Sequence, residues 1–469
     1  MTNMLQRFPK QIASKGIMVY LIALMVVSAV FNGYAMKFVF MAFGIIEVIG
    51  FFAGSTILSR KWAGASSRQY ESHLFWLALI IRIAWVVFSY LFFISFTGQP
   101  FEPGAADSLG YHDTATWLKG REFKFVFSYL FQRGSVSDSG YVFYLTMVYK
   151  ICGNGVIVPR IFKSVMSAFS TVLIYKMVAR SVDEETGRLA GAFAMLMPNL
   201  IIYCGLHLKE TEMLFLLCAF LERTDYLIRT REYSMGTILL PLILCASLFT
   251  FRTVLGAVAF FSLCTGLLFT STRVVGLVKK VLVVFWILLA AAVLTGGAIS
   301  SDIERYYVER TENQVHKRSE QTSRGNLWAQ YATGAVMAPM MFVLPFSTMV
   351  DVDEQYTQQI LHGGNLVRNY MGYFVLVALF VAFFRRKDWR NYLLIGTYSI
   401  GYLAILSLSG FANSERFLLP ALPGLIFLWA YGVRVLDKHS YRYFSYWVYV
   451  VFFMQVAWAY FKLGSRGLF

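Results

Sequence analysis

Charged residues are scarce in this sequence of 469 residues. Only 14% of them are Asp, Glu, Lys or Arg, whereas 58% are hydrophobic. Soluble domains carry about 25% charged residues, so this composition excludes an ordinary soluble protein. We expect no large soluble domain, and we find no internal repeat or low-complexity tract.

Cysteines are also few. The five cysteines show no Cys-x-x-Cys spacing and lie in or beside apolar segments. This pattern argues against a disulfide framework and favours buried, small hydrophobic side chains. They are Cys152, Cys204, Cys218, Cys245 and Cys264.

Neither a G-x-x-x-x-G-K-[ST] loop nor a G-x-S-x-G elbow occurs in the sequence. The first absence removes support for a nucleotide-driven pump, and the second for a hydrolase with a serine triad. His and Cys residues show no zinc spacing. The sequence therefore requires no metal, although a divalent cation is compatible with it, and the cofactor stays unknown.

The sequence contains instead a succession of apolar runs. About 20 apolar residues form a helix that crosses the hydrocarbon core of a membrane. We therefore predict an all-α, polytopic membrane protein with about thirteen transmembrane helices. The first run leads into the second without an Ala-x-Ala site, so we expect no cleavable secretory signal. The predicted spans are Gly16–Phe31, Met36–Leu58, Leu74–Phe96, Ile161–Ala179, Leu189–Gly205, Thr211–Ile228, Met235–Phe251, Val254–Thr270, Val281–Ile299, Tyr370–Phe384, Tyr392–Leu408, Phe417–Val433 and Tyr443–Tyr460.

The net charge of +16 is distributed in a way that predicts orientation. Lys and Arg gather at the ends of apolar runs, as topology signals do, so we expect membrane lipids and no nucleic acid as partners. The N-terminus is then cytoplasmic and the loop at 98–140 lies outside. This assignment requires that Tyr141–Cys152 and Val336–Val350 do not cross, and we predict interfacial or re-entrant elements there. The expected location is the cell membrane of a bacterium, with the site facing the periplasm or the exterior.

The chain divides into four predicted segments. Residues 1–72 form an N-terminal extension of two spans, and 73–297 form a transmembrane module with its first outer loop at 98–140. Residues 298–367 form an outer polar loop with a re-entrant or interfacial segment. Residues 368–469 supply the C-terminal helices.

The first outer loop carries the residues that best suit chemistry at a lipid–water boundary. Asp107 follows the third span closely, and Tyr111, His112 and Asp113 come directly after it. On a helix, Asp107 and Tyr111 share a face at i and i+4, while Asp113 points elsewhere. A plain alternative is that these residues only cap a surface helix.

Four more outer positions are candidates for binding an anion, and a fifth, Glu210, is a candidate for a second carboxylate that faces Asp107. The turn at Leu206–Glu212 contains His207, Lys209 and Glu210. Further along the chain, Arg252 lies between two spans and Arg416 begins another. An Arg fork suits bidentate phosphate recognition. The alternatives are a solvated turn with a local ion pair, and arginines that only snorkel to headgroups.

Arg82 lies deep inside a predicted span. An isolated charge there is expensive and requires a partner. We expect a structural intramembrane pair, for which Glu47 in the second span is a candidate.

The order of these motifs resembles a known family. An outer loop with Asp107-Ser-Leu-Gly-Tyr-His is followed by Ser139-Gly-Tyr-Val-Phe-Tyr-Leu, Pro159-Arg160, Pro198-Asn-Leu, Lys209-Glu210 and Glu415-Arg416-Phe-Leu-Leu-Pro-Ala-Leu-Pro. This order is similar to the GT-C superfamily of membrane glycosyltransferases, in the branch of protein mannosyltransferases and aminoarabinose transferases. The resemblance covers Leu74 to about Val433.

The resemblance implies roles for individual residues. Asp107 would be the catalytic base with Asp113 as a fallback, Glu210 the acidic residue of the second outer loop, and Arg416 the group that holds the donor phosphate. Tyr111, His112, His207, Lys209 and Arg252 would bind substrate. The two spans before Leu74 and the absence of a large C-terminal domain depart from the family pattern, so the acceptor class stays open.

The implied reaction is inverting transfer of a sugar from a polyprenyl-phosphate donor to the hydroxyl of a lipid, glycan or protein. Two alternatives remain. A flippase or other transporter of lipid-linked glycans would place its ionisable residues near the membrane midplane. An O-antigen ligase or polymerase would use one large outer loop, for which Ser301–Ala335 with His316 is suited.

Overall fold

The computed structural model describes residues 7–131, 136–230, 232, 234–269, 342–343, 345–352, 356–408 and 415–468. Within these ranges the chain is helical, and the one β-bridge joins Ala35 to Val350. The N-terminal half contains α1 (Lys10–Val30), α2 (Phe38–Lys61), α3 (Ser67–Thr97), α4 (Ala106–Leu118), α5 (Phe123–Phe131), α6 (Ser139–Cys152), α7 (Ile157–Ser181), α8 (Glu184–Leu196), α9 (Pro198–Ile202), α10 (Glu210–Thr230), α11 (Met235–Phe251) and α12 (Thr253–Phe269). The C-terminal part contains α16 (Tyr356–Ile360), α17 (His362–Phe380), α18 (Leu393–Leu408), α19 (Glu415–Leu418), α20 (Leu422–Arg434) and α21 (Lys438–Gly464).

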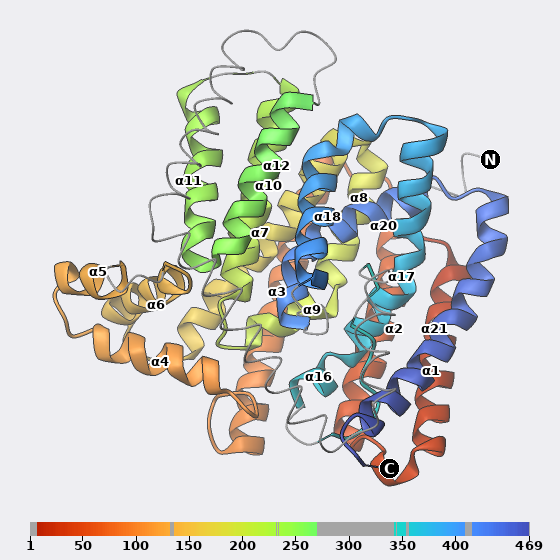
Figure 1. The fold of residues 1–469 in the computed structure, drawn as a ribbon, viewed down its shortest axis with the longest axis horizontal. Coiled ribbons are helices and arrows are strands. Elements are labelled where there is room, and N and C mark those ends of the chain that lie inside the picture. Colours follow the sequence, from red (N-terminus) through yellow and green to blue (C-terminus); the bar gives the residue numbers. More distant parts are fainter. Residues whose placement is uncertain are drawn as a thin grey trace.

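The long helices form one bundle (Figure 1). Helix α7 packs against α3, α8 and α10, and α17 packs against α2, α20 and α21. Helix α20 also contacts α8, so segments far apart in the sequence share one core. This packing buries most of α17 and α20, while α3 and α21 keep large exposed apolar side chains, as helices that face lipid do.

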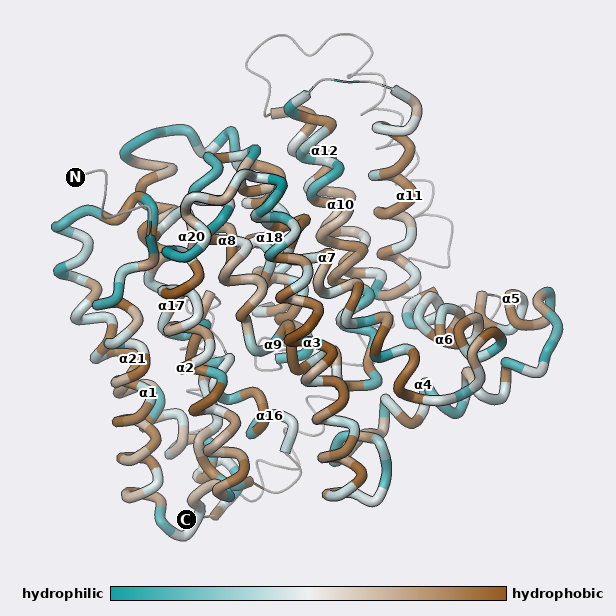
Figure 2. The backbone as a smooth tube through the Cα atoms, turned by 180° about the vertical axis from the view of Figure 1, so that it is seen from behind, coloured by the Kyte–Doolittle hydropathy of each residue, from teal (hydrophilic) through white to brown (hydrophobic). Residues whose placement is uncertain are grey.

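Seven helices of the described chain are long and apolar enough to cross a membrane, and eight if one bent pair counts as a span. The all-α, multi-pass prediction is therefore confirmed at this level. The number thirteen stays a prediction, because α11 and α12 are shorter apolar helices and the predicted span Val281–Ile299 lies outside the described residues. In Figure 2 the hydrophobic stretches run along these helices, and hydrophilic backbone gathers at the turns above α18 and α20.

The bundle has two chemically different ends. At one end, basic residues of the loops predicted to be cytoplasmic pair with carboxylates, and we call this the ion-paired end. Its pairs include Arg180–Asp225 at 3.3 Å, Arg188–Glu184 at 3.0 Å, Arg434–Glu185 at 2.8 Å and Lys176–Glu71 at 2.9 Å. The loops that carry these pairs thus share one end, as the charge pattern predicts, whereas the loop with Arg273, Lys279 and Lys280 lies outside the described residues. The side of the membrane that this end faces stays a prediction.

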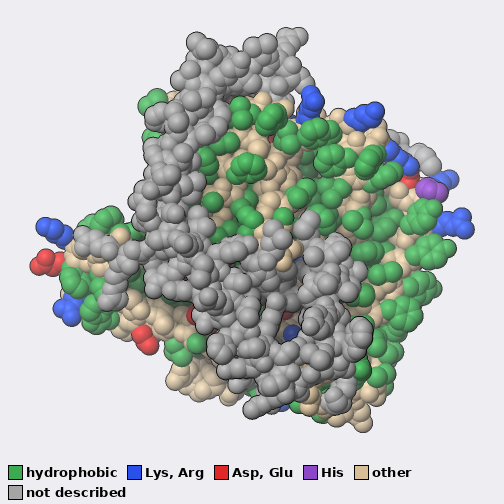
Figure 3. Space-filling model, viewed as in Figure 1, with side chains coloured by type: hydrophobic (Ala, Val, Ile, Leu, Met, Phe, Trp, Pro, Cys, Tyr) green, Lys and Arg blue, Asp and Glu red, His purple; other side chains and the backbone are tan. Residues whose placement is uncertain are grey.

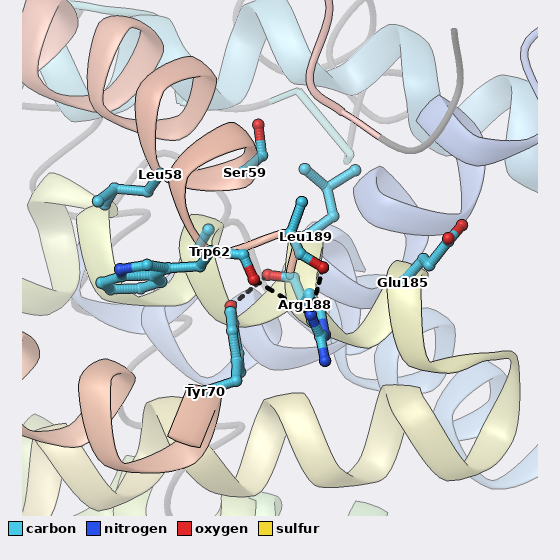
Figure 4. Close-up of a pocket in the computed structure, with 9 residues that line it drawn as sticks. Leu58, Ser59, Trp62, Tyr70, Glu185, Arg188 and Leu189 are labelled. Carbon is cyan, nitrogen blue, oxygen red and sulfur yellow. Dashed lines mark hydrogen bonds between the residues drawn. The ribbon is translucent and has the colours of Figure 1, made fainter. Parts of the chain in front are cut away.

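A small pocket lies at the ion-paired end, between the C-terminal turn of α2 and the start of α8 (Figure 4). Arg188 lines the pocket and donates hydrogen bonds to the carbonyls of Trp62, Ala63 and Ala65 at 3.1, 3.1 and 2.6 Å. Tyr70 donates to the carbonyl of Arg188 at 2.5 Å. These contacts tie the α2–α3 turn to α8, so the arginine of this pocket serves the packing of the bundle.

Arg82 has partners other than the predicted Glu47. It is fully buried and donates to Ser167 Oγ at 2.6 Å and to the carbonyls of Ala194 and Met195 at 3.3 and 3.2 Å. These carbonyls end α8, where Pro198 lacks the N–H that would bond to residue 194. Arg82 therefore supplies the hydrogen bonds that the helix break removes.

This break changes one predicted span. Residues 189–205 form two pieces, α8 and the segment Pro198–Gly205, with an angle of 53° between them. The chain then passes through the turn at 206–209 into α10. Glu210 begins this helix, whereas Asp225, near its other end, belongs to the ion-paired end. Glu210 therefore lies at the opposite end of the bundle, which we call the site end.

Helices α4, α5 and α6 form a separate layer beside the bundle (Figure 1). Helix α6 has only 14 residues and packs against α4, α5 and α11, so it is too short to span a membrane. Helix α5 exposes Phe123, Phe125 and Phe127. The interfacial or re-entrant placement of Tyr141–Cys152 stays a prediction. Of the second such segment, Val336–Val350, residues 336–341 and 344 lie outside the described residues.

The face drawn in Figure 3 shows how charge and apolar surface divide. Hydrophobic side chains cover the upper centre and the right of the described surface, while Lys and Arg gather at the upper right margin and charged side chains of both signs stand at the projecting tip on the left. An exposed apolar surface of this kind suits contact with lipid.

We expect Arg82→Met to lower stability, because the buried carbonyls of Ala194 and Met195 would lose their donor. An unsatisfied buried acceptor costs about 1–3 kcal/mol, so the purified variant should unfold at a lower temperature in detergent. Arg121→Met, which removes an exposed arginine above the ring of Trp117, is the control. Equal melting temperatures for the Arg82 variant and the wild type would contradict the capping role.

Candidate active site

Asp107, Glu210 and Arg416 meet at the site end. The guanidinium of Arg416 donates from Nη1 to Asp107 Oδ2 and from Nε to Glu210 Oε1. Asp107 and Arg416 are 309 positions apart in the sequence, and Glu210 and Arg416 are 206 apart. The structure thus brings together the three residues to which the family resemblance assigns the main roles.

Local sequence places each of the three side chains. Gly104, with φ +72°, turns the chain before α4, so that Asp107 falls in the first turn of that helix. Glu210 is the first residue of α10, where free N–H groups favour a negative charge. Arg416 belongs to the short α19, which ends at Leu418, two residues before Pro420.

Arg252 adds a second guanidinium to the same carboxylate. Its Nη2 lies 3.5 Å from Glu210 Oε1, and its Nη1 donates to Tyr402 Oη at 3.2 Å. The guanidinium stands over the ring of Phe417, 4.5 Å from the centroid. Because the Glu210 side chain is fully buried and Asp107 is 61% exposed, the two carboxylates play different parts. Glu210 holds the arginines from inside, and Asp107 faces the outside.

Lys209 is held by different partners. Its Nζ donates to the carbonyl of Phe251 at 2.8 Å and forms an ion pair with Asp138. Asp138, with φ 73°, precedes α6. Lys209 therefore joins the layer of α4, α5 and α6 to the bundle. Sequence reasoning missed Asp138, because only the fold brings it next to Lys209.

Tyr111 lies on the face of α4 that carries Asp107, as the i, i+4 spacing predicts. It shares a hydrogen bond with Arg416, and its ring packs edge-on against Tyr141 with centroids 5.0 Å apart. Burial raises the pKa of Tyr111 to about 12, so its hydroxyl stays protonated and can act as a donor. Asp113 is exposed on another face of α4, where it lacks the contact with Arg416 that Asp107 has.

His112 and His207 form a second cluster with Tyr149. His112 Nδ1 lies 2.8 Å from Tyr149 Oη, which lies 3.0 Å from His207 Nε2. Burial lowers the pKa of both histidines, and in His207 the nearby Lys163, Arg160 and His112 add to the decrease. Both rings are therefore neutral near pH 7 and do not offer the positive charge expected of phosphate ligands.

A buried lysine supports the turn before Glu210. Lys163 donates to the carbonyls of Leu206, at 2.8 Å, and Leu208, and lies 3.6 Å from Glu212 Oε2. Sequence reasoning missed Lys163, although a lysine inside the apolar run Ile161–Ala179 was a usable signal.

Comparisons with known proteins give no family: no protein-family model matches the chain, and no curated protein is significantly similar to it. Among the described residues, no three His, Cys, Asp or Glu side chains lie close enough to hold a metal ion. The fold by itself defines an all-α protein with several helices able to cross a membrane. The particular activity must be argued from the site.

We expect His207 to make stability fall with decreasing pH. The pKa of His207 is depressed in the folded state, so below about pH 6.5, the ordinary value for His, the unfolded chain takes up a proton that the folded chain does not. The melting temperature should therefore drop between about pH 7 and pH 5. His207→Gln keeps an acceptor for Tyr149 and should make this drop smaller; an unchanged slope would contradict the assignment.

Proposed function

We propose that this protein is an inverting glycosyltransferase that works at the outer face of the membrane and moves a sugar from a polyprenyl phosphate to an acceptor hydroxyl. The observation that carries the proposal is the contact of one guanidinium, Arg416, with a buried and an exposed carboxylate. The resemblance to GT-C enzymes assigns the same three residues to catalysis. The proposal is supported by the contact among Asp107, Glu210 and Arg416, which lie far apart in the sequence.

The donor phosphate suits the arginine pair. Arg416 and Arg252 present two forks next to each other, both held by Glu210. A phosphate accepts bidentate hydrogen bonds from such a fork. The phosphate would replace Asp107 as the acceptor for Nη1 of Arg416, because Asp107 is exposed and can move away. Glu210 is buried and stays bound to the arginines. Donor binding therefore frees the Asp107 carboxylate.

The reaction needs one base and one stabilised leaving group. The acceptor oxygen bonds to C1 of the sugar, the bond from C1 to the phosphate oxygen breaks, and Asp107 takes the hydroxyl proton. The lipid phosphate leaves with one more negative charge, which Arg416 and Arg252 neutralise. One displacement at C1 inverts the anomeric centre, through an oxocarbenium-like transition state.

Charge balance favours this assignment. In the structure three cations face three carboxylates at the site, with Arg416, Arg252 and Lys209 against Asp107, Glu210 and Asp138. During transfer the phosphate gains one negative charge while Asp107 loses one by protonation. The net charge of the site is unchanged across the reaction, because the proton released by the acceptor hydroxyl stays on Asp107.

A second candidate function is transport of a lipid-linked glycan. Transport is favoured by a set of buried polar residues in the first turns of α17. These residues, His362, Asn365 and Arg368, lie in the core of the bundle. Ionisable residues inside a membrane bundle mark substrate pathways in transporters. Reconstitution in vesicles separates the two functions, because a transporter moves labelled lipid between leaflets without cleaving the sugar.

We expect Asp107→Asn to abolish transfer of sugar from radiolabelled polyprenyl phosphates in a membrane reconstitution. Loss of a positioned base costs about 10²–10⁴-fold in rate. Binding of the donor should not weaken, because the phosphate no longer competes with a carboxylate for Arg416. Asp113→Asn, on the same helix and also exposed but without the contact with Arg416, is the matched control. If that control loses activity while Asp107→Asn keeps it, the base is Asp113.

We expect Arg416→Lys to weaken donor binding. Lysine keeps the charge but loses the fork, which corresponds to about 1.5–3 kcal/mol, or roughly ten- to more than a hundredfold in affinity. Donor-lipid binding to the purified variant measures this, with Arg121→Lys as the control for an exposed interfacial arginine. Unchanged affinity would reduce Arg416 to a membrane anchor and leave the phosphate to Arg252 or Lys209.

A further inference from the structure

Glu415 and Arg416 are neighbours in the chain, yet their side chains enter two different networks. Arg416 reaches outward to Asp107 and Glu210, whereas Glu415 is only 6% exposed and lies against α17. Its Oε1 accepts a hydrogen bond from Asn365 Nδ2 at 2.9 Å. The backbone that carries Arg416 is therefore fixed from inside by the side chain immediately before it.

This inner network continues to the helix break. Asn365 Oδ1 accepts a hydrogen bond from Asn199 Nδ2 at 3.3 Å, and both residues are fully buried or nearly so. Asn199 follows Pro198 at the start of α9, in the segment that leads to Glu210. The chain Asn199–Asn365–Glu415 thus joins the support of Glu210 to the support of Arg416.

The sequence of α17 is adapted to this contact. A Cβ on Gly364 would lie 2.2 Å from Asn199 Oδ1, so a larger residue there would displace the Asn199 amide, which donates to Asn365. The N–H of Gly364 donates to Glu47 Oε2 at 2.8 Å, which satisfies one free donor at the start of this helix. Glu47 therefore anchors α17 and is not the partner of Arg82.

The contact that fixes the Glu415 side chain is the hydrogen bond from Asn365 Nδ2. Lys462 on α21 and Arg368, one turn after Asn365 on α17, also act electrostatically on the carboxylate. Because Glu415 directly precedes Arg416, this hydrogen bond ties the backbone of Arg416 to α17.

We propose that Asn365 and Glu415 are positioning residues, which set the place of Arg416 relative to Glu210 and thereby the affinity for the donor phosphate. The inference rests on the proposed function and assigns a role to residues that touch neither the phosphate nor the sugar. A guanidinium that moves by about 1 Å loses a bidentate contact, and such displacements cost large factors in activity.

An exchange of the two polar groups tests the proposal. In Asn365→Asp the new carboxylate faces Glu415, so the hydrogen bond is lost and two acceptors oppose each other. In Glu415→Gln an amide still reaches Asn365, and the effect should be smaller. In the double variant the amide introduced at position 415 donates to the carboxylate introduced at position 365. Asn199 then keeps its acceptor, and Arg368 keeps a negative partner.

The measurement is binding of a short-chain polyprenyl phosphate without sugar to each purified variant. We expect Asn365→Asp to raise Kd about tenfold, and the double variant to return within about threefold of the wild type. The matched control is Asn369→Asp, one turn further along α17. Asn369 is equally buried and donates to the carbonyls of Val343 and Pro345, which do not belong to the chain that reaches Arg416.

Each outcome decides the proposal. Weaker binding in Asn365→Asp with recovery in the double variant, and unchanged binding in Asn369→Asp, supports positioning through Glu415. Equal losses in the Asn365 and Asn369 variants, or no recovery in the double variant, would overturn it, because general loosening of α17 would then explain the effect. If the wild type binds no polyprenyl phosphate, the proposed function itself fails and takes this role with it. If the wild type binds and Asn365→Asp binds equally well, only the positioning role is lost.

Discussion

Glu210 is a fully buried carboxylate at the start of a helix, and its burial constrains everything around it. An unpaired charge in such a place would cost several kcal/mol, so Arg416 and Arg252 must both remain beside it. Their other contacts then extend outward to Asp107 and sideways to Tyr402. The buried Glu210 thus fixes the two arginines, and Arg416 in turn holds the exposed Asp107 at the edge of the site.

The same rule explains the helix break in the middle of the bundle. Pro198 removes a hydrogen bond from α8, and a bilayer offers no water to replace it. Arg82 supplies the missing donors from the neighbouring α3, at 3.3 and 3.2 Å. Asn199, just after the break, donates a hydrogen bond to Asn365 of α17. Hydrogen bonds therefore connect the helix break to both α3 and α17.

Charged residues are arranged differently at the two ends of the molecule. At the ion-paired end the basic loops pair with carboxylates of their own, and these pairs, such as Arg188 with Glu184, close the bundle. At the site end, two arginines share Glu210, and the exposed Asp107 is held by Arg416. The carboxylate of Glu210 thus has two guanidiniums beside it, whereas Asp107 contacts Arg416.

The sequence alone determined the all-α, multi-pass class of the protein, several of its long apolar helices and the face shared by Asp107 and Tyr111. These depend on hydrophobic run length and on the period of a helix, both of which are local. It also indicated Glu210 and Arg416 as candidates, through the order of motifs. It did not show that these residues touch, nor that Asn365, Lys163 and Asp138 support them, and it gave Arg82 the wrong partner. Side-chain pairs between distant segments depend on how the helices pack, and only the tertiary structure decides which polar groups must satisfy one another away from water.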